Sequence, residues 1–190
     1  RYNLMIRGIK TDIEIFRKEN IALSVRQTEL ITESQTIKGA MTVVFENEEK
    51  TFPQMGAYLE SNNRSLRESA WTSMSDRMMQ DNERLSEIFD ELVTIRHQMA
   101  LNAGFESYTN YMFKAMHRFD YTVEDCIEFH QSVESVCMPI LSEINKNRLE
   151  SLKLDQLRPW DVNEKGGSGP DIHGRDPLRP FKTVEEMVVV

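Results

Sequence analysis

The sequence predicts a mainly α protein, with long antiparallel helices in an irregular helical array and one small β-hairpin at about residues 41–52. Apolar residues recur every three or four positions over long stretches, which is the spacing of one buried helix face. Residues 41–45 are instead apolar and rich in β-branched side chains, which is typical of a strand. Residues 46–49 are polar and are predicted to form a turn, and residues 50–52 are predicted to form the second strand. Two strands alone are marginally stable, so we expect the hairpin to pack on helices.

The first 40 residues are expected to be helical, with a seam that mixes apolar and small polar side chains. The apolar members of this seam are Ile9, Ile13, Phe16, Leu23, Leu30, Ile37 and Met41. Asn20, Gln27 and Ser34 fall on the same seam. Such a seam is either a partly polar interface between helices or a face toward a wet cleft. We favour the interface, because polar seam residues commonly fix helix register.

A short helix is predicted from Pro53 through Leu59, since proline suits the first helical turn. A second long helix is expected to begin near residues 63–65, where the pattern S-x-x-E is typical of a capping box, and to stop at Gly104. Its apolar stripe has one polar interruption near Asp81 and comprises Leu66, Ala70, Met74, Met78, Leu85, Ile88, Leu92, Ile95 and Met99. A short aromatic helix follows at about residues 108–113.

A third long helix is predicted to begin at about residue 122, because Thr122 and Asp125 have the spacing of an N-terminal capping pair. Its expected core stripe is Val123, Ile127, His130, Val133, Cys137, Ile140 and Ile144. On this stripe His130 is interpreted as a hydrogen-bonded core histidine. Pro139 lies inside the stripe and should kink the helix, because proline removes a backbone donor.

The two cysteines, Cys126 and Cys137, lie on this same predicted helix. Eleven residues of helix separate them by about 16 Å along the axis, which is too far for a disulfide. We interpret both as buried core thiols and expect a reducing, cytoplasmic setting.

Three regions are expected along the chain. Residues 1–157 form a helical wall region with the inserted β-hairpin. Residues 158–182 form an irregular segment, in which the Gly-rich stretch 166–170 is a possible linker. Residues 183–190 begin a truncated helix that leads to an absent catalytic part.

The charge balance excludes one class of partner. Acidic residues (31) outnumber basic ones (23), for a formal charge of −8 and a pI near 5.1. Nucleic-acid binding without sequence preference needs a basic surface, so no nucleic-acid partner is expected. No stretch approaches the roughly 20 apolar residues of a membrane span, so no membrane partner is expected either.

The usual catalytic motifs are missing. The four histidines, His97, His117, His130 and His173, include no pair four residues apart, so no HExxH zinc helix is present. The residues left as functional candidates are Arg118, Asp120 and Tyr121 in an aromatic connector, and the segment 158–161 (RPWD). Irregular loops of this kind often carry function. The alternative, which we favour, is that their Arg and Asp side chains cap helix ends while the rings lock the packing.

Several segments, in this order, resemble a known family. They are ELITESQTIKGAMTVV at 29–44, RHQMALNAGFE at 96–106, YTNYMFKAMHRFDY at 108–121 followed by TVEDC, LRPWD at 157–161 and GRDPLRPF at 174–181. Together they resemble the oligoendopeptidase F family, which are zinc metallopeptidases related to thimet oligopeptidase. The resemblance runs from about Tyr2 to the end of the chain.

The resemblance implies a nearly all-helical, bowl-like enzyme that cleaves short peptides in an internal cleft. It also implies that the HExxH helix, a distant Glu ligand, and the His and Tyr that stabilise the tetrahedral intermediate follow the PLRPF region. The sequence contains no HExxH, so no catalytic and no metal-binding residue is assigned here, and the substrate-binding residues stay unknown. The chain is therefore expected to be a fragment upstream of the HExxH region and to be inactive alone.

The same resemblance assigns the cofactor and the partners to the parent enzyme. Zinc belongs to that enzyme, and none is expected on this chain. Its partners are the oligopeptide substrate and the remaining catalytic part of the same protein. The open termini, Arg1 and the three valines at 188–190, likewise lead us to expect a piece of something larger.

Two alternatives stay open. The chain is a standalone helical binding or scaffold module without catalysis, or it is one chain of a clipped enzyme whose remainder is another chain. The stretch 166–170 is either a natural loop or an engineered linker, because such proteins usually have a shorter connection between Asp161 and Gly174.

Overall fold

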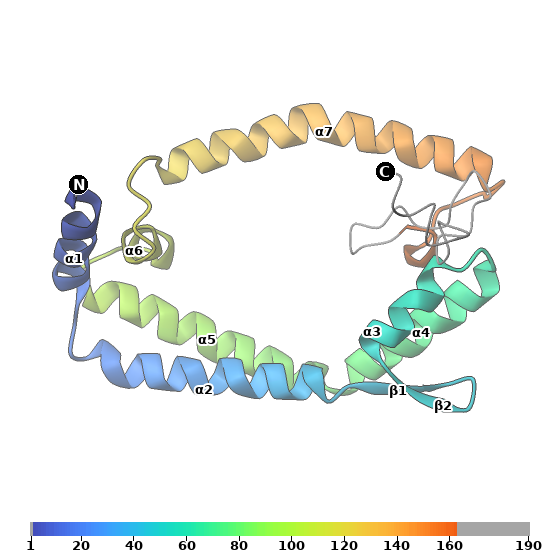
Figure 1. The fold of residues 1–190 in the computed structure, drawn as a ribbon, viewed down its shortest axis with the longest axis horizontal. Coiled ribbons are helices and arrows are strands. Elements are labelled where there is room, and N and C mark those ends of the chain that lie inside the picture. Colours follow the sequence, from blue (N-terminus) through green and yellow to red (C-terminus); the bar gives the residue numbers. More distant parts are fainter. Residues whose placement is uncertain (1, 163–190) are drawn as a thin grey trace. The chain divides into compact units, whose positions relative to one another are not determined.

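The computed structural model describes residues 2–162, and these divide into two compact units (Figure 1). Unit 1 comprises residues 2–39 and 82–138, and unit 2 comprises residues 40–81 and 139–162. The predicted linker at 166–170, the last helix at 183–190 and His173 lie outside the described residues.

Unit 1 is built from helices. They are α1 (Asn3–Ile15), α2 (Asn20–Gly39), α5 (Asn82–Asn102), α6 (Tyr108–Ala115) and the first part of α7 (Val123–Ser151). Unit 2 contains the hairpin and shorter helices: β1 (Thr42–Phe45), β2 (Glu48–Thr51), α3 (Phe52–Gly56), the 3₁₀ helix η1 (Ala57–Glu60), α4 (Arg64–Gln80), the rest of α7 and the 3₁₀ helix η2 (Pro159–Asp161). The prediction of a mainly α fold with one small hairpin is confirmed.

The hairpin forms in the predicted region, but its turn is shorter than the predicted 46–49, since β2 already begins at Glu48 and ends at Thr51. Its antiparallel register runs from Thr42 opposite Thr51 to Phe45 opposite Glu48. Glu46 and Asn47 both have positive φ angles, 54° and 64°, as the tight turn of a two-residue hairpin requires. Within unit 2 the inward side chains of β1 pack with Met55 and Ala70, so the hairpin is supported by helices as expected.

The core of unit 1 lies between α2 and α5, which Figure 1 shows side by side. Leu30 of α2 is fully buried against one face of α5, which comprises Ile88, Leu92, Ile95 and Met99. The polar seam of α2 joins this interface. The Asn20 side chain donates to the Met99 carbonyl at 3.0 Å and accepts from Asn102 at 2.8 Å. Gln27 accepts from Arg96 at 3.2 Å, so the interface interpretation holds for both residues.

Two of the three predicted long helices are each divided in two. The rhythm of the first 40 residues is interrupted after Ile15, and α2 begins only at Asn20. The second long helix ends at Gln80, and a new helix starts at Asn82. Asp81 has a non-helical backbone and forms an ion pair with Arg77 one turn earlier. The polar interruption in the stripe is therefore a true break, because the chain turns out of the helix at this residue.

The helix starts follow local side-chain chemistry. At the start of α4, the Asn63 side chain accepts from the backbone N–H groups of Ser65 and Leu66, so Asn63 and not Ser65 is the cap. At the start of α7, the Asp125 carboxylate accepts from the Thr122 backbone N–H at 2.7 Å, and the Thr122 hydroxyl accepts from the Asp125 N–H at 3.1 Å. The capping pair predicted from the sequence is confirmed.

The predicted core stripe of α7 is wrong. The helix continues through Pro139, but it has no buried residue. Its apolar side chains are open to solvent, with exposed fractions of 49% for Ile127 and 55% for Ile140. His130 and Cys137 are exposed and Cys126 is half-buried, so none of the three is a core residue. The spacing marks an apolar face correctly, but residues 2–162 place no partner surface over it.

No helix within residues 2–162 has the length and apolar character that a membrane crossing requires.

Candidate functional site

The aromatic connector after α6 is held against α1. His117 adopts a positive φ of 53°, and its Nε2 lies 2.8 Å from Asp12 Oδ1. Its ring stacks on Phe119 with the ring centroids 5.5 Å apart. Gly8 lies directly under this imidazole, since a Cβ atom there would come within 3.0 Å of His117 Cε1. The absence of a side chain at Gly8 thus lets the connector approach α1 closely.

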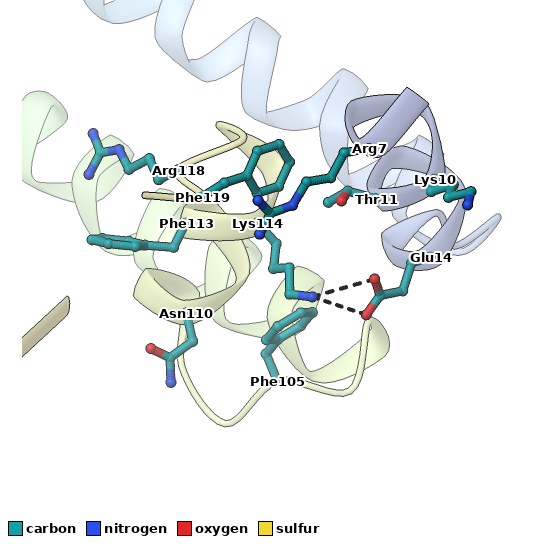
Figure 2. Close-up of a pocket in the computed structure, with 10 residues that line it drawn as sticks. All are labelled: Arg7, Lys10, Thr11, Glu14, Phe105, Asn110, Phe113, Lys114, Arg118 and Phe119. Carbon is teal, nitrogen blue, oxygen red and sulfur yellow. Dashed lines mark hydrogen bonds and ion pairs between the residues drawn. The ribbon is translucent and has the colours of Figure 1, made fainter. Parts of the chain in front are cut away.

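Beside this contact a pocket of about 530 Å³ opens within unit 1 (Figure 2). Its walls come from α1, from the turn after α5, from α6 and from the connector. We call it the cationic pocket. Its lining residues are Arg7, Lys10, Thr11, Glu14, Phe105, Asn110, Phe113, Lys114, Arg118 and Phe119.

Aromatic rings hold two of the pocket arginines in place. The Arg7 guanidinium lies 4.1 Å from the centre of the Phe119 ring. The Arg118 guanidinium lies 5.0 Å from the centre of the Phe113 ring and 5.9 Å from that of Tyr121. These cation–π contacts hold both guanidinium groups beside aromatic rings without neutralising them.

The pocket has an excess of positive charge, although the chain as a whole is negatively charged. Four of its lining residues are cationic and one, Glu14, is a carboxylate. Glu14 interacts with Lys114, whose Nζ lies 3.3 Å from Glu14 Oε1 (Figure 2). The chain as a whole has a formal charge of −8. A local excess of positive charge in an acidic protein makes this pocket attractive to anions.

Arg118 is therefore the residue of the connector that the structure brings into a site. Asp120 is exposed and lines no part of the pocket. Tyr121 is 45% exposed and contacts the Arg118 guanidinium and the Phe113 ring. Sequence reasoning missed Arg7, Lys10 and Lys114, because the spacing within α1 and α6 gives no sign that the two helices meet.

The RPWD segment lies in unit 2 and forms a buried ion-pair cluster with α4. The Asp161 side chain is fully buried. It accepts from Arg64 Nε and Nη2 at 2.9 and 2.8 Å, and from Arg67 Nη2 at 3.0 Å. It also accepts from the Arg158 backbone N–H at 3.0 Å, which closes the 3₁₀ turn. The structural alternative for this segment is thus supported.

Arg67 is the centre of this cluster and is only 2% exposed. Besides Asp161, its guanidinium donates to the Trp160 carbonyl at 2.8 Å and to the Ser61 carbonyl at 2.9 Å. Trp160 in turn packs on Trp71, with the ring centroids 5.5 Å apart. One signal for the cluster was present in the sequence. A helix start disfavours cations, so Arg64 in the first turn of α4 indicates a specific acidic partner.

The pKa of Asp161 reflects two opposing causes. Burial by itself raises the pKa of the carboxyl group, since a buried charge loses its hydration. The hydrogen bonds from Arg64, from the Arg158 backbone and from Arg67 outweigh burial and leave the pKa of Asp161 below its ordinary value. Asp161 is therefore a charged structural group at neutral pH and not a poised acid or base.

Residues 2–162 do not fit a zinc ion. Among them, no three His, Cys, Asp or Glu side chains come together in a group that could hold a metal. His97 and His130 are exposed, and the one acidic partner of His117 is Asp12. A zinc site of the kind implied by the resemblance needs three protein ligands around one ion.

Comparisons with known proteins agree on one kind of relative. The model of peptidase family M3 matches residues 57–189. Among curated proteins, no sequence matches the chain. The fold is similar to that of a protein assigned as an oligoendopeptidase F from Bacillus anthracis str. Ames, with a TM-score of 0.80 and 22% sequence identity over 87% of this chain and 30% of that one.

Another solved structure that the fold resembles is PZ peptidase A with an inhibitor, with a TM-score of 0.80 and 22% identity over 83% of this chain and 28% of that one. A further protein assigned as oligoendopeptidase F has a TM-score of 0.79, 20% identity and coverage of 83% and 28%. The chain thus spans less than a third of the length of these structures.

Proposed function

The chain belongs to peptidase family M3, and from this membership we propose that it is part of a zinc-dependent oligoendopeptidase, which hydrolyses peptide bonds in short peptides. The observation that carries the proposal is the family match over residues 57–189. The fold supports it, because both oligoendopeptidase F structures and PZ peptidase A superpose on most of this chain.

Within that enzyme we assign this chain a framework role. Residues 2–157 supply a helical wall, and Asp161 anchors the start of the following segment, 158–162, to α4. The resemblance supports a role upstream of the HExxH region, because it implies that this motif follows the PLRPF segment at 177–181.

Zinc is proposed for the parent enzyme, held by residues outside those described here. When bound, such an ion activates water and polarises the scissile carbonyl. The described residues would act on the reaction only by supporting the catalytic part. We further propose a cytoplasmic setting, which is supported by two free cysteines, Cys126 and Cys137.

A cleavage assay with an internally quenched fluorescent peptide tests the proposal. The purified 190-residue chain and the product of the complete open reading frame are compared with and without a chelator. We expect no cleavage by the chain alone. The complete product should cleave the peptide, lose activity with the chelator and regain it with zinc.

Two results would contradict the proposal. One is zinc-dependent cleavage by the 190-residue chain alone. The other is a complete reading frame without an HExxH downstream of Val190. A stop codon directly after Val190 would instead favour a helical binding module without catalysis, a candidate that the cationic pocket also supports.

A further inference from the structure

Three cations of the cationic pocket have no acidic partner among residues 2–162. Arg7 contacts the Phe119 ring and Arg118 contacts the rings of Phe113 and Tyr121, while Lys10 makes no hydrogen bond or ion pair with a described residue. This differs from the arginines elsewhere in the described chain that bind carboxylates, namely Arg26, Arg64, Arg67, Arg77 and Arg84. In an acidic chain, cations that have no carboxylate partner are available for an external anion.

The stacked arginines are suited to bind an oxyanion. A guanidinium that lies over a ring uses its flat face for the contact and keeps its N–H edge available. That edge matches the two oxygens of a carboxylate. Because the Phe119 and Phe113 rings already hold the two guanidinium groups, less side-chain freedom is lost when the anion binds.

The remaining lining residues favour a peptide over a bare phosphate. Glu14 is 60% exposed although it contacts Lys114, so its carboxylate still has oxygens that can accept hydrogen bonds. It can accept from a peptide N–H, a donor that a bare phosphate does not have. Asn110 offers both a donor and an acceptor, as a peptide group requires. Phe105 gives the pocket an apolar wall against which an apolar side chain can pack.

We propose that the cationic pocket binds a peptide through a carboxylate group, which the Arg7 guanidinium receives, while Lys10 and Arg118 add positive charge from opposite edges of the pocket (Figure 2). The carboxylate is either the free C-terminus of the peptide or an acidic side chain. A peptide as ligand accords with the proposed function, but the pocket binds it without zinc and without cleavage. A failure of either proposal can therefore be recognised separately.

The test is a fluorescence anisotropy titration of the 190-residue chain with three labelled peptides, in buffer with a chelator. The first peptide ends in an apolar residue with a free carboxylate, the second is its amidated twin, and the third is the amidated twin with one internal Glu. We expect the second to bind about tenfold or more weakly than at least one of the others, because it lacks the charge-assisted hydrogen bonds. Preference for the first or third peptide supports the proposal and identifies the source of the carboxylate.

Matched variants locate the binding. Lys10→Gln and Arg118→Gln each remove one pocket cation, and Lys18→Gln removes one exposed cation of unit 1 outside the pocket. We expect each pocket variant to weaken binding by about threefold to tenfold. A loss of this size lies between that expected for an exposed ion pair and that expected for a charge-assisted hydrogen bond. The control should bind as the unmodified chain does. Thermal unfolding by circular dichroism checks that all three variants are folded.

Three results would overturn the inference. The amidated peptide without Glu binds as tightly as both others, or the pocket variants bind no more weakly than Lys18→Gln. In the third, inorganic phosphate displaces the peptide at concentrations equal to those of the unlabelled peptide. That last result would show a simple anion site in which the peptide part of the ligand contributes nothing.

Discussion

The Asp161 cluster allows a direct test of what holds the RPWD segment to α4. Asp161→Asn keeps the shape of the side chain but removes its charge and places an amide N–H₂ among the donors of Arg64 and Arg67. Because Arg67 is 2% exposed, its charge would stay buried without a counter-ion. Loss of one partner of a buried ion pair typically costs about 3–5 kcal/mol. The Arg64 side chain is 37% exposed and can turn to water, so we expect about 3 kcal/mol.

The chain carries a built-in probe for this measurement. Its two tryptophans, Trp71 and Trp160, lie against each other in the same cluster, so intrinsic fluorescence reports on unit 2. Urea unfolding of the variant is compared with that of Asp155→Asn, which removes an exposed carboxylate of the same unit. A loss of less than about 0.5 kcal/mol in Asp161→Asn, the size expected of a surface change, would refute the reasoning.

The pH dependence of the same ion pair has a fixed sign. Since the folded-state pKa of Asp161 is below its ordinary value of about 3.9, its contribution to stability is complete above that value. It is lost as the pH falls through the folded-state pKa, where the carboxylate takes up a proton. The stability difference between the unmodified chain and Asp161→Asn should therefore stay constant above about pH 5 and shrink below about pH 4. A difference that grows on acidification would contradict this assignment.

Three further predictions concern packing. Trp160→Ala should reduce amide-exchange protection of residues 157–162 more than that of α2 and α5, because the indole packs on Trp71 in unit 2; equal loss in both would contradict it. Gly8→Ala should lower the free energy of unfolding by about 1–2 kcal/mol, because a Cβ would lie 3.0 Å from the His117 imidazole, which Asp12 already holds in place. This clash outweighs the higher helix preference of Ala. Gly39→Ala is its control, because a Cβ there meets nothing within 4 Å, and an equal drop in melting temperature for both would count against the clash. Leu30→Ala should cost about 3 kcal/mol, as its fully buried side chain leaves a cavity between α2 and α5; a loss below about 1 kcal/mol by circular dichroism would show that the cavity collapses.

Local patterns predicted the elements of this fold well. The helical spacing of α2 and α5, the β-branched run of β1 and the capping pair of α7 each depend on residues close in sequence, and each is found in the structure. The break at Asp81 was missed as a helix end, because the apolar stripe resumes at Leu85, seven positions or two helical turns after Met78, and so stays in phase across it. The α7 stripe failed for another reason, since periodicity shows which face is apolar but not what covers it.

The site residues illustrate the limit of a single sequence. Arg118 was a candidate, but one wall of the cationic pocket comes from α1, about a hundred residues earlier; Glu14 and Lys114, for example, are 100 positions apart. Arg67 and Asp161 are likewise 94 positions apart. Pairings over such distances depend on how helices meet, and no local spacing contains that information.

The separation of Arg67 from Asp161 also has a consequence for synthesis on the ribosome. Arg67 leaves the ribosome 94 residues before the carboxylate that neutralises it. At a translation rate of about 5–20 residues per second, the nascent chain spends roughly 5–20 s with α4 made and its counter-ion missing. During that interval the buried position of Arg67 is unfavourable, so unit 2 should reach its final packing only when the RPWD segment emerges. The order of the chain thus sets the time at which unit 2 can mature.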